Sequence, residues 1–285
     1  MRPTTLLRLL PFTALTACEV SLSGGSSGGV TATLQTELAT AVQDELLGLA
    51  PALVVPGSGA PPGASLPAGC PAASSTTDSD GDGIPDDARL TFTNPPCSLS
   101  GFLGGTLTLD GTVRIQDPSG GNSTALDATL ADLRWSYTDP GGIRSFTTTR
   151  NGTLNRLGSP DAALLAVNVT TVRHRPNRAA ATIGLVGTLD FTAETPGSLE
   201  LDQPVPAGDL TLDGTWTWRR RTEDYRLTVS TVVPLQYDPT CAGPHRFRAG
   251  RLELAGTLQG RQGTLVLTWS ACGTDPARRW LESLT

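Results

Sequence analysis

Four segments of the chain share the pattern Leu/Ile-x-Leu-x-Gly-Thr, and this repeat limits the possible folds more than any other feature. The segments read LTLDGTVRI, IGLVGTLDF, LTLDGTWTW and LELAGTLQG, at residues 107–115, 183–191, 210–218 and 252–260. Successive side chains of a strand point to opposite faces, so a strand that runs straight through each segment places its large apolar residues on one face. A two-residue turn at the Asp-Gly of two copies would divide them between both faces. We therefore expect long strands, each with a glycine in the middle of its apolar face.

A glycine at such a position lets a sheet bend sharply or lets another group approach the backbone closely. Further alternating segments follow the same pattern, and turn signals separate them, among them Asn-Gly at 151–152 and Arg-Gln at 261–262. A two-residue turn at 261–262 would pair Leu258 with Leu265. We expect a mainly β fold over residues 89–285, a strongly curved antiparallel meander of roughly ten to twelve strands that forms a barrel or half-barrel.

Residues 30–49 differ from the rest, because their apolar side chains recur every three or four positions and predict an amphipathic helix within residues 30–50. Pro51 ends this pattern, and residues 51–77 form a Pro/Gly/Ala-rich linker. Two occupants could fill the concave face of the sheet: this helix, or an apolar ligand such as an acyl chain. In outline the architecture resembles periplasmic lipoprotein-carrier half-barrels and lipocalin-like barrels. The residues of the possible ligand face are Gly111, Gly187, Gly214, Trp216, Trp218 and Gly256.

The first seventeen residues have the layout of a secretory signal peptide, with Arg2 and Arg8 before a short apolar core. The stretch at 15–18, Leu-Thr-Ala-Cys, resembles the lipobox of bacterial lipoproteins. This resemblance implies that Cys18 becomes the lipid-modified first residue of the mature chain, followed by a Gly/Ser-rich tether up to residue 29. Glu19 is not the aspartate of the inner-membrane retention signal. We therefore expect an exported protein held by its lipid at a membrane, with the outer membrane favoured.

An acidic loop at residues 78–88 carries aspartates at alternate positions. Its sequence DSDGDGIPDD resembles the calcium loops of thrombospondin type 3 repeats and the first half of an EF-hand loop. The resemblance implies a weak calcium site, with a Kd of roughly 0.1 to 1 mM. Arg89 stands where both families place a closing carboxylate, so Asp87 or a more distant residue would complete the shell. The implied ligands are the side chains of Asp78, Asp80, Asp82 and Asp86 and the carbonyl of Ile84.

Four cysteines remain once Cys18 carries lipid, and an even number in an exported protein predicts two disulfides. Sequence order favours Cys70 with Cys97 and Cys241 with Cys272. Free thiols and a zinc site are the alternatives, but the chain has no CxxC motif.

The formal net charge is −6, and loss of Arg2 and Arg8 with the signal peptide makes it more negative, which disfavours a nucleic-acid partner. The chain has no GxSxG, no HExxH and no phosphate-binding glycine loop after a strand, and its two histidines, His174 and His245, lie in polar, turn-like contexts. We therefore expect a non-catalytic, lipid-anchored lipoprotein of the cell envelope, whose β-domain is structural or binds an envelope component. The alternative is a carrier or sensor of an apolar ligand.

Overall fold

The computed structural model describes residues 29–53, 72–74, 77–81, 84–93, 97–102, 105–118, 125–138, 145–176, 178–200, 203, 205–241 and 246–283. One α-helix, α1 (Ala32–Leu49), continues into a short 3-10 helix, η1 (Ala50–Leu53). All other regular elements are strands. They are β1 (Ala72–Ala73), β2 (Asp87–Thr91), β3 (Cys97–Phe102), β4 (Gly105–Gln116), β5 (Leu126–Thr138), β6 (Ser145–Gly158), β7 (Ala162–His174), β8 (Ala181–Ala193), β9 (Gly208–Arg220), β10 (Glu223–Tyr237), β11 (Phe247–Leu258), β12 (Arg261–Trp269) and β13 (Ala277–Glu282).

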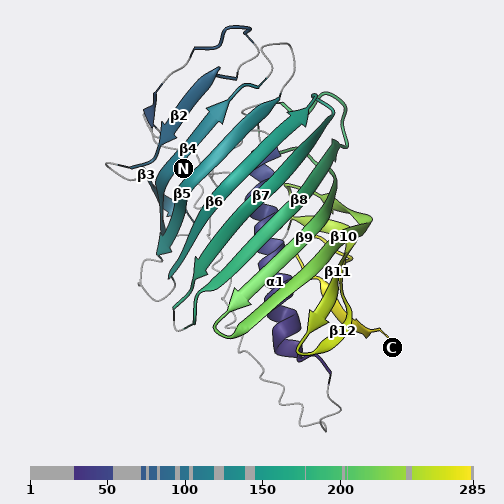
Figure 1. The fold of residues 1–285 in the computed structure, drawn as a ribbon. Helices are drawn as coiled ribbons and strands as arrows, with labels where there is room; N and C mark the ends of the chain where they lie inside the picture. Colours follow the sequence, from purple (N-terminus) through teal and green to yellow (C-terminus); the bar gives the residue numbers. More distant parts are fainter. Residues whose placement is uncertain are drawn as a thin grey trace, which may run out of the picture.

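These thirteen strands form one antiparallel sheet, in which β4 to β13 follow one another in chain order as a meander. Before the meander, β2 and β3 pair with successive parts of β4, and β1 pairs with β2. The sheet is open, because the path of paired strands runs from β1 to β13 without closing. It curves strongly, and α1 lies on its concave side (Figure 1). The predicted mainly β, curved meander with one N-terminal helix is confirmed.

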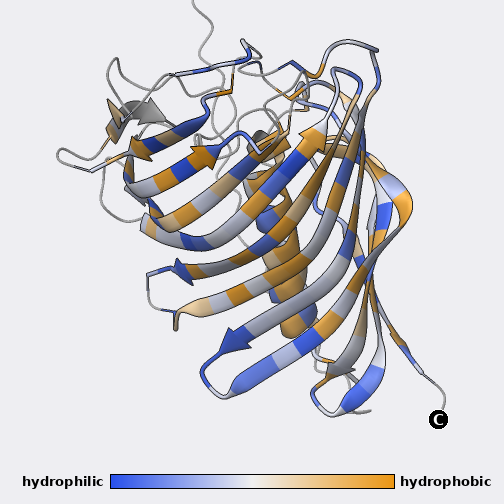
Figure 2. Ribbon diagram, turned by 45° about the horizontal axis from the view of Figure 1, so that its top comes forward, coloured by the Kyte–Doolittle hydropathy of each residue, from blue (hydrophilic) through white to orange (hydrophobic). Residues whose placement is uncertain are grey.

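The predicted inward face is also confirmed, since every large apolar residue at the inward phase of the four repeat segments is buried. Apolar and polar residues accordingly alternate along the strands (Figure 2). The glycines of this face allow adjacent strands to approach closely. Gly187 of β8 faces Gly214 of β9, and a Cβ atom on Gly187 would lie 2.2 Å from the carbonyl oxygen of Asp213. The group that approaches the backbone here is therefore the neighbouring strand.

Two turn predictions were wrong. Asn151-Gly152 lies inside β6, where Gly152 pairs with Val169 of β7 instead of forming a turn. The last hairpin turns at Gln259-Gly260, not at Arg261-Gln262. Both turn residues have positive φ, 51° and 77°, a conformation that glycine adopts readily.

The register of this hairpin therefore differs from the prediction by four residues, because Leu254, and not Leu258, pairs with Leu265. A shift by an even number leaves every side chain on its predicted face. This is why the burial pattern was predicted correctly from a wrong pairing.

Helix α1 begins at Ala32, after the N-cap residue Thr31, whose hydroxyl accepts a hydrogen bond from the Leu34 amide. Its apolar side chains join the same hydrophobic core as the inward face of the sheet. The α-helix ends at Leu49, before Pro51 as predicted, and η1 adds one 3-10 turn after it. Most of the predicted linker, residues 54–71, lies outside the described residues.

Candidate functional site

The concave face of the sheet is occupied by α1, which is held along its whole length by polar contacts to successive strands. At its start, the Thr31 amide donates to Oε1 of Gln259, in the β11–β12 turn, at 3.0 Å. The next contacts involve β9, β7 and β6 in that order, so the helix crosses the strands against their chain order. These contacts are Glu37 with Arg220, Asp44 and Glu45 with Arg173, and Glu45 with Arg150.

The most deeply buried of these contacts form a network around Glu45, whose side chain has no exposed surface. Its Oε1 accepts hydrogen bonds from Nη2 of Arg150 at 2.7 Å and from Oγ1 of Thr171 at 2.9 Å. Its Oε2 accepts from Nη2 of Arg173 at 3.2 Å. Arg150 also donates to the carbonyl oxygen of Gly48, at the C-terminal end of α1, where the helix dipole favours a cation. One carboxylate thus fixes the helix to two neighbouring strands.

Burial governs the electrostatics of the two arginines that β6 directs into this interface. Loss of solvation lowers the pKa of Arg150 from its ordinary value, while the Glu45 charge opposes that change. Burial likewise lowers the pKa of Arg156, whose Nε donates to the Leu53 carbonyl at the end of η1. Both remain guanidinium cations at neutral pH, because the ordinary pKa of arginine lies far above that range. Both cations therefore hold the C-terminal end of the helix through hydrogen bonds to its carbonyl oxygens.

The residues proposed as a ligand face are enclosed by the protein itself. The side chains of Trp216 and Trp218 are buried in the core that includes α1. The guanidinium of Arg220, which pairs with Glu37 of the helix, stacks 5.6 Å from the centre of the Trp218 ring. Of the four glycines, Gly111, Gly187 and Gly214 face neighbouring strand backbone, and the Leu227 side chain lies closest to Gly256. Apart from a small cavity beside α1 that Trp218 helps to line, an apolar ligand could reach this face only if α1 moved away.

The acidic loop is folded on itself by its own aspartates. Asp86 accepts hydrogen bonds from the amide of Ser79 at 2.9 Å and from its hydroxyl at 2.5 Å, and Asp78 accepts from the Gly81 amide at 2.8 Å. Both carboxylate oxygens of Asp80 are shielded from solvent, while the Ile84 side chain is buried in the core. Asp82 lies outside the described residues. Asp78, Asp80 and Asp86 therefore share one short loop, but among the described residues their carboxylates do not form a cluster with the spacing of metal ligands.

Asp87 belongs to a different structure from the rest of the loop. It is the first residue of β2, and its carboxylate receives two hydrogen bonds from Arg114 of β4, at 2.9 and 2.6 Å. These bonds lower the pKa of Asp87. Arg89 continues β2 and exchanges hydrogen bonds with Ser74. Asp78, Asp80 and Asp86 thus carry the oxygen ligands that a hard cation prefers, whereas Asp87 is directed to Arg114.

Cys241 and Cys272 form the predicted disulfide, which joins the β10–β11 connection to the β12–β13 connection. Cys97 is also disulfide-bonded, and its predicted partner, Cys70, lies outside the described residues, as do Cys18 and the tether. The Asp238 carboxylate lies close to both bonded sulfurs, but disulfide sulfurs are not thiolate ligands for a metal. Neither described helix has the length and apolarity needed to span a membrane.

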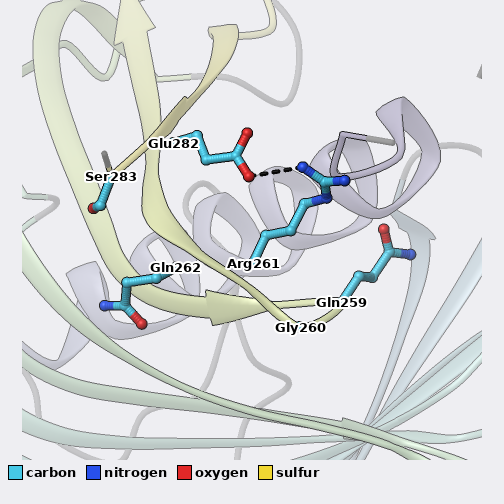
Figure 3. Close-up of a pocket in the computed structure, with 6 residues that line it drawn as sticks. All are labelled: Gln259, Gly260, Arg261, Gln262, Glu282 and Ser283. Atoms are coloured by element: carbon cyan, nitrogen blue, oxygen red, sulfur yellow. Dashed lines mark hydrogen bonds and ion pairs between the residues drawn. The ribbon is translucent and has the colours of Figure 1, made fainter. Parts of the chain in front are cut away.

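A polar hollow of about 470 Å³ lies beside the β11–β12 turn. Figure 3 shows Arg261 and Glu282 pointing toward each other across it, with Gln259 and Gln262 at its margin. The Arg261–Glu282 ion pair, at 2.7 Å, neutralises the one cation among its lining residues. This hollow therefore offers no charge for a ligand to complement.

The buried network was not predicted, although the sequence contains a signal for it. Glu45 falls between Val42 and Leu49 on the apolar stripe of the helix, where a charge is costly unless it is paired. Arg150 shares the inward phase of β6 with Leu154, and Thr171 and Arg173 extend the inward series of β7. Charged residues in phase with buried apolar ones on separate elements indicate a buried ion pair.

Searches for similar proteins gave no relative from which a function could be transferred. No protein-family model, no curated protein and no solved structure matched this chain significantly.

Proposed function

We propose that this protein is a non-catalytic, lipid-anchored lipoprotein of the cell envelope, with a structural or interaction β-domain. The observation that carries the proposal is the occupation of the concave face by α1, secured by the buried Glu45 network. A sheet filled by its own helix supports a structural role over a carrier role, because the apolar lining that a carrier would offer is already in contact with protein. Lipid on Cys18 would hold this body at the membrane, with the outer membrane favoured.

The described ionisable groups support the absence of catalysis. Burial lowers the pKa of Arg150 and of Arg156, and both side chains are engaged in holding α1 and η1. His174 is exposed at the end of β7. An acid–base pair needs two titratable groups in one accessible pocket with separated pKa values. Arg150 and Arg156 instead contact the helix end through hydrogen bonds.

Metabolic labelling with palmitate tests the anchor. The wild-type protein should incorporate label and stay with the membranes after alkaline carbonate extraction, whereas Cys18→Ser should incorporate none. Ser21→Ala, a small change in the same segment, is the control and should behave as wild type. Equal labelling of the wild type and Cys18→Ser would refute lipidation at this residue. Saturable binding of a long-chain fatty acid by the folded protein would contradict the structural role and favour the carrier.

We further propose that the acidic loop binds calcium weakly, through Asp78, Asp80, Asp82 and Asp86 with the carbonyl of Ile84. The support is the alternating spacing of the aspartates in the sequence and the enclosure of the Asp80 oxygens. Bound calcium would neutralise these charges and stiffen the loop, whose Ile84 side chain already anchors it in the core. Because Asp87 pairs with Arg114, water or a residue beyond the loop would complete the shell.

Calorimetric titration with calcium tests this site. The double variant Asp80→Asn/Asp82→Asn should lose the binding heat of the wild type. The matched control, Asp190→Asn/Asp209→Asn, removes two exposed aspartates of β8 and β9 and should retain it. Binding heat that is unchanged in the loop variant would show that Asp80 and Asp82 do not bind calcium.

A further inference from the structure

A second cavity lies between α1 and the sheet and differs from the polar hollow in its charge. It encloses about 260 Å³ near the β7–β8 and β9–β10 turns. Four arginines line it, Arg173, Arg175, Arg178 and Arg220. Ile183 and Trp218 give it an apolar floor. We call this cavity the arginine pocket.

The carboxylates around the arginine pocket do not balance its guanidinium groups. Glu37, at the pocket wall, is shared between Arg220 at 2.7 Å and Arg178 at 3.5 Å. Asp44 is likewise shared between Arg173 at 3.0 Å and Arg175 at 3.1 Å. Each carboxylate therefore faces two cations. Glu45 does not correct the imbalance, because it divides its charge between Arg173 and Arg150.

The surplus cations are the accessible ones. The side chains of Arg175 and Arg178 are 47% and 57% exposed, whereas those of Arg173 and Arg220 are 12% and 24% exposed. The inner pair thus builds the wall, and the outer pair stands at the mouth. A guanidinium carries five N–H donors in a planar fork that matches phosphate oxygens. In their ion pairs with Asp44 and Glu37, Arg175 and Arg178 each use one guanidinium nitrogen.

The shape and lining of the arginine pocket favour a small anionic group that carries an apolar part. Its volume is below the range of about 300 to 1,000 Å³ that is usual for drug-sized ligands. A phosphate at the mouth would meet Arg175 and Arg178, and the first carbons attached to it would lie over Ile183 and Trp218. This is the chemistry of a phospholipid headgroup and not of a whole acyl chain.

The position of the arginine pocket connects it with the membrane, an argument that rests on the lipid anchor proposed above. The pocket lies against the N-terminal half of α1, at Thr36, Glu37 and Thr40. Only residues 19–30 separate Cys18 from the N-cap of this helix. A flexible segment of this length has a root-mean-square span of about 20 Å and a fully extended length of about 40 Å. We propose that the arginine pocket binds the phosphate-bearing headgroup of a membrane lipid beside the anchor.

Calorimetry of the full-length protein in a non-ionic detergent tests this proposal, with hexyl phosphate as the probe. The wild type should bind it saturably, and Arg175→Gln/Arg178→Gln should bind at least tenfold more weakly, because two charge-assisted contacts are lost. The inner arginines keep Glu37 and Asp44 paired in this variant, so the fold should persist. The matched control, Arg278→Gln/Arg279→Gln, removes two exposed arginines of β13 and should bind as wild type.

Absence of saturable hexyl phosphate binding, or equally weakened binding in both double variants, would contradict the proposal that the arginine pocket binds a phosphate group. Inorganic phosphate separates the two sources of the anion. Weaker binding of phosphate than of hexyl phosphate supports a lipid headgroup, whereas equal binding overturns the lipid assignment in favour of free phosphate. The palmitate experiment is independent: a wild-type protein that incorporates no palmitate but still binds hexyl phosphate would refute the anchor and support the pocket.

Discussion

At the scale of single residues, Glu45 determines how α1 is seated. Its carboxylate is fully enclosed and bonded to Arg150, Thr171 and Arg173. The favourable interaction of a buried pair roughly offsets the cost of desolvating both ions, but removing one partner leaves the other buried without its countercharge. The network therefore contributes less to net stability than to the position of the helix, and its rupture is costly.

Glu45→Gln should lower the free energy of unfolding by about 3 to 5 kcal/mol, because Arg150 would lose its buried countercharge. Urea denaturation followed by circular dichroism measures this change. Glu282→Gln is the matched control, since it breaks the exposed ion pair with Arg261 and should cost no more than about 1 kcal/mol. Similar small losses in both variants would show that the Glu45 network does not fix the helix.

At the scale of elements, Gly152 shows how a strand of the curved sheet tolerates a tight approach. It has φ of 137° within β6, and a Cβ atom there would lie 2.1 Å from the carbonyl oxygen of Asn168 on β7. The obstructing atom belongs to the backbone of a paired strand, so it cannot rotate away. Gly111 of β4 meets the Asp132 carbonyl in the same manner, at 2.4 Å.

Gly152→Ala should therefore destabilise the protein by more than about 2 kcal/mol, since backbone strain adds to the clash. Gly197→Ala isolates the strain alone. Gly197 also has positive φ, 78°, but has open space around it, so its substitution should cost about 1 kcal/mol. Thermal unfolding of the two variants makes the comparison, and equal losses would contradict a role for close strand approach.

The same elements show which parts of the fold could be predicted. The alternation of side chains identified the inward face of β4, β8, β9 and β11, because period two survives any even shift in register. Turn positions were less predictable. Asn-Gly is typical of a tight turn but fits β6 because Gly152 needs a positive φ there. The turn at Gln259-Gly260 depends on backbone conformations for which glutamine gives no signal.

At the scale of the whole molecule, helix and sheet share one hydrophobic core. Leu38 and Leu46 of α1 are as deeply buried as Leu185 of β8 and Leu212 of β9. The amphipathic pattern predicted the helix. The apolar concave face indicated that either the helix or an apolar ligand must cover it. Sequence alone could not choose the occupant, because the contacts that settle it, such as Glu45 with Arg150, join residues 105 positions apart.

A single core predicts a single unfolding transition. Leu38→Ala should lower the free energy of unfolding by about 2 to 5 kcal/mol through the cavity it creates in the core. The loss should be equal by far-ultraviolet circular dichroism and by tryptophan fluorescence, because helix and sheet unfold together. The control is Leu157→Ala, on an exposed position of β6, which should change stability little. Separate transitions for the two probes would show that α1 detaches while the sheet stays folded.

The order in which α1 meets the strands also defines a mechanical path. A pull on the chain at residue 29 first meets buried Val30 and the hydrogen bonds between Thr31 and Gln259, on an exposed hairpin near the sheet edge. The solvent-accessible ion pair of Glu37 with Arg178 comes next. The enclosed Glu45–Arg150 pair lies almost at the far end of the helix. A force applied at residue 29 would thus reach the exposed contacts before the enclosed pair, so the N-terminal end of the helix would be released before its C-terminal end.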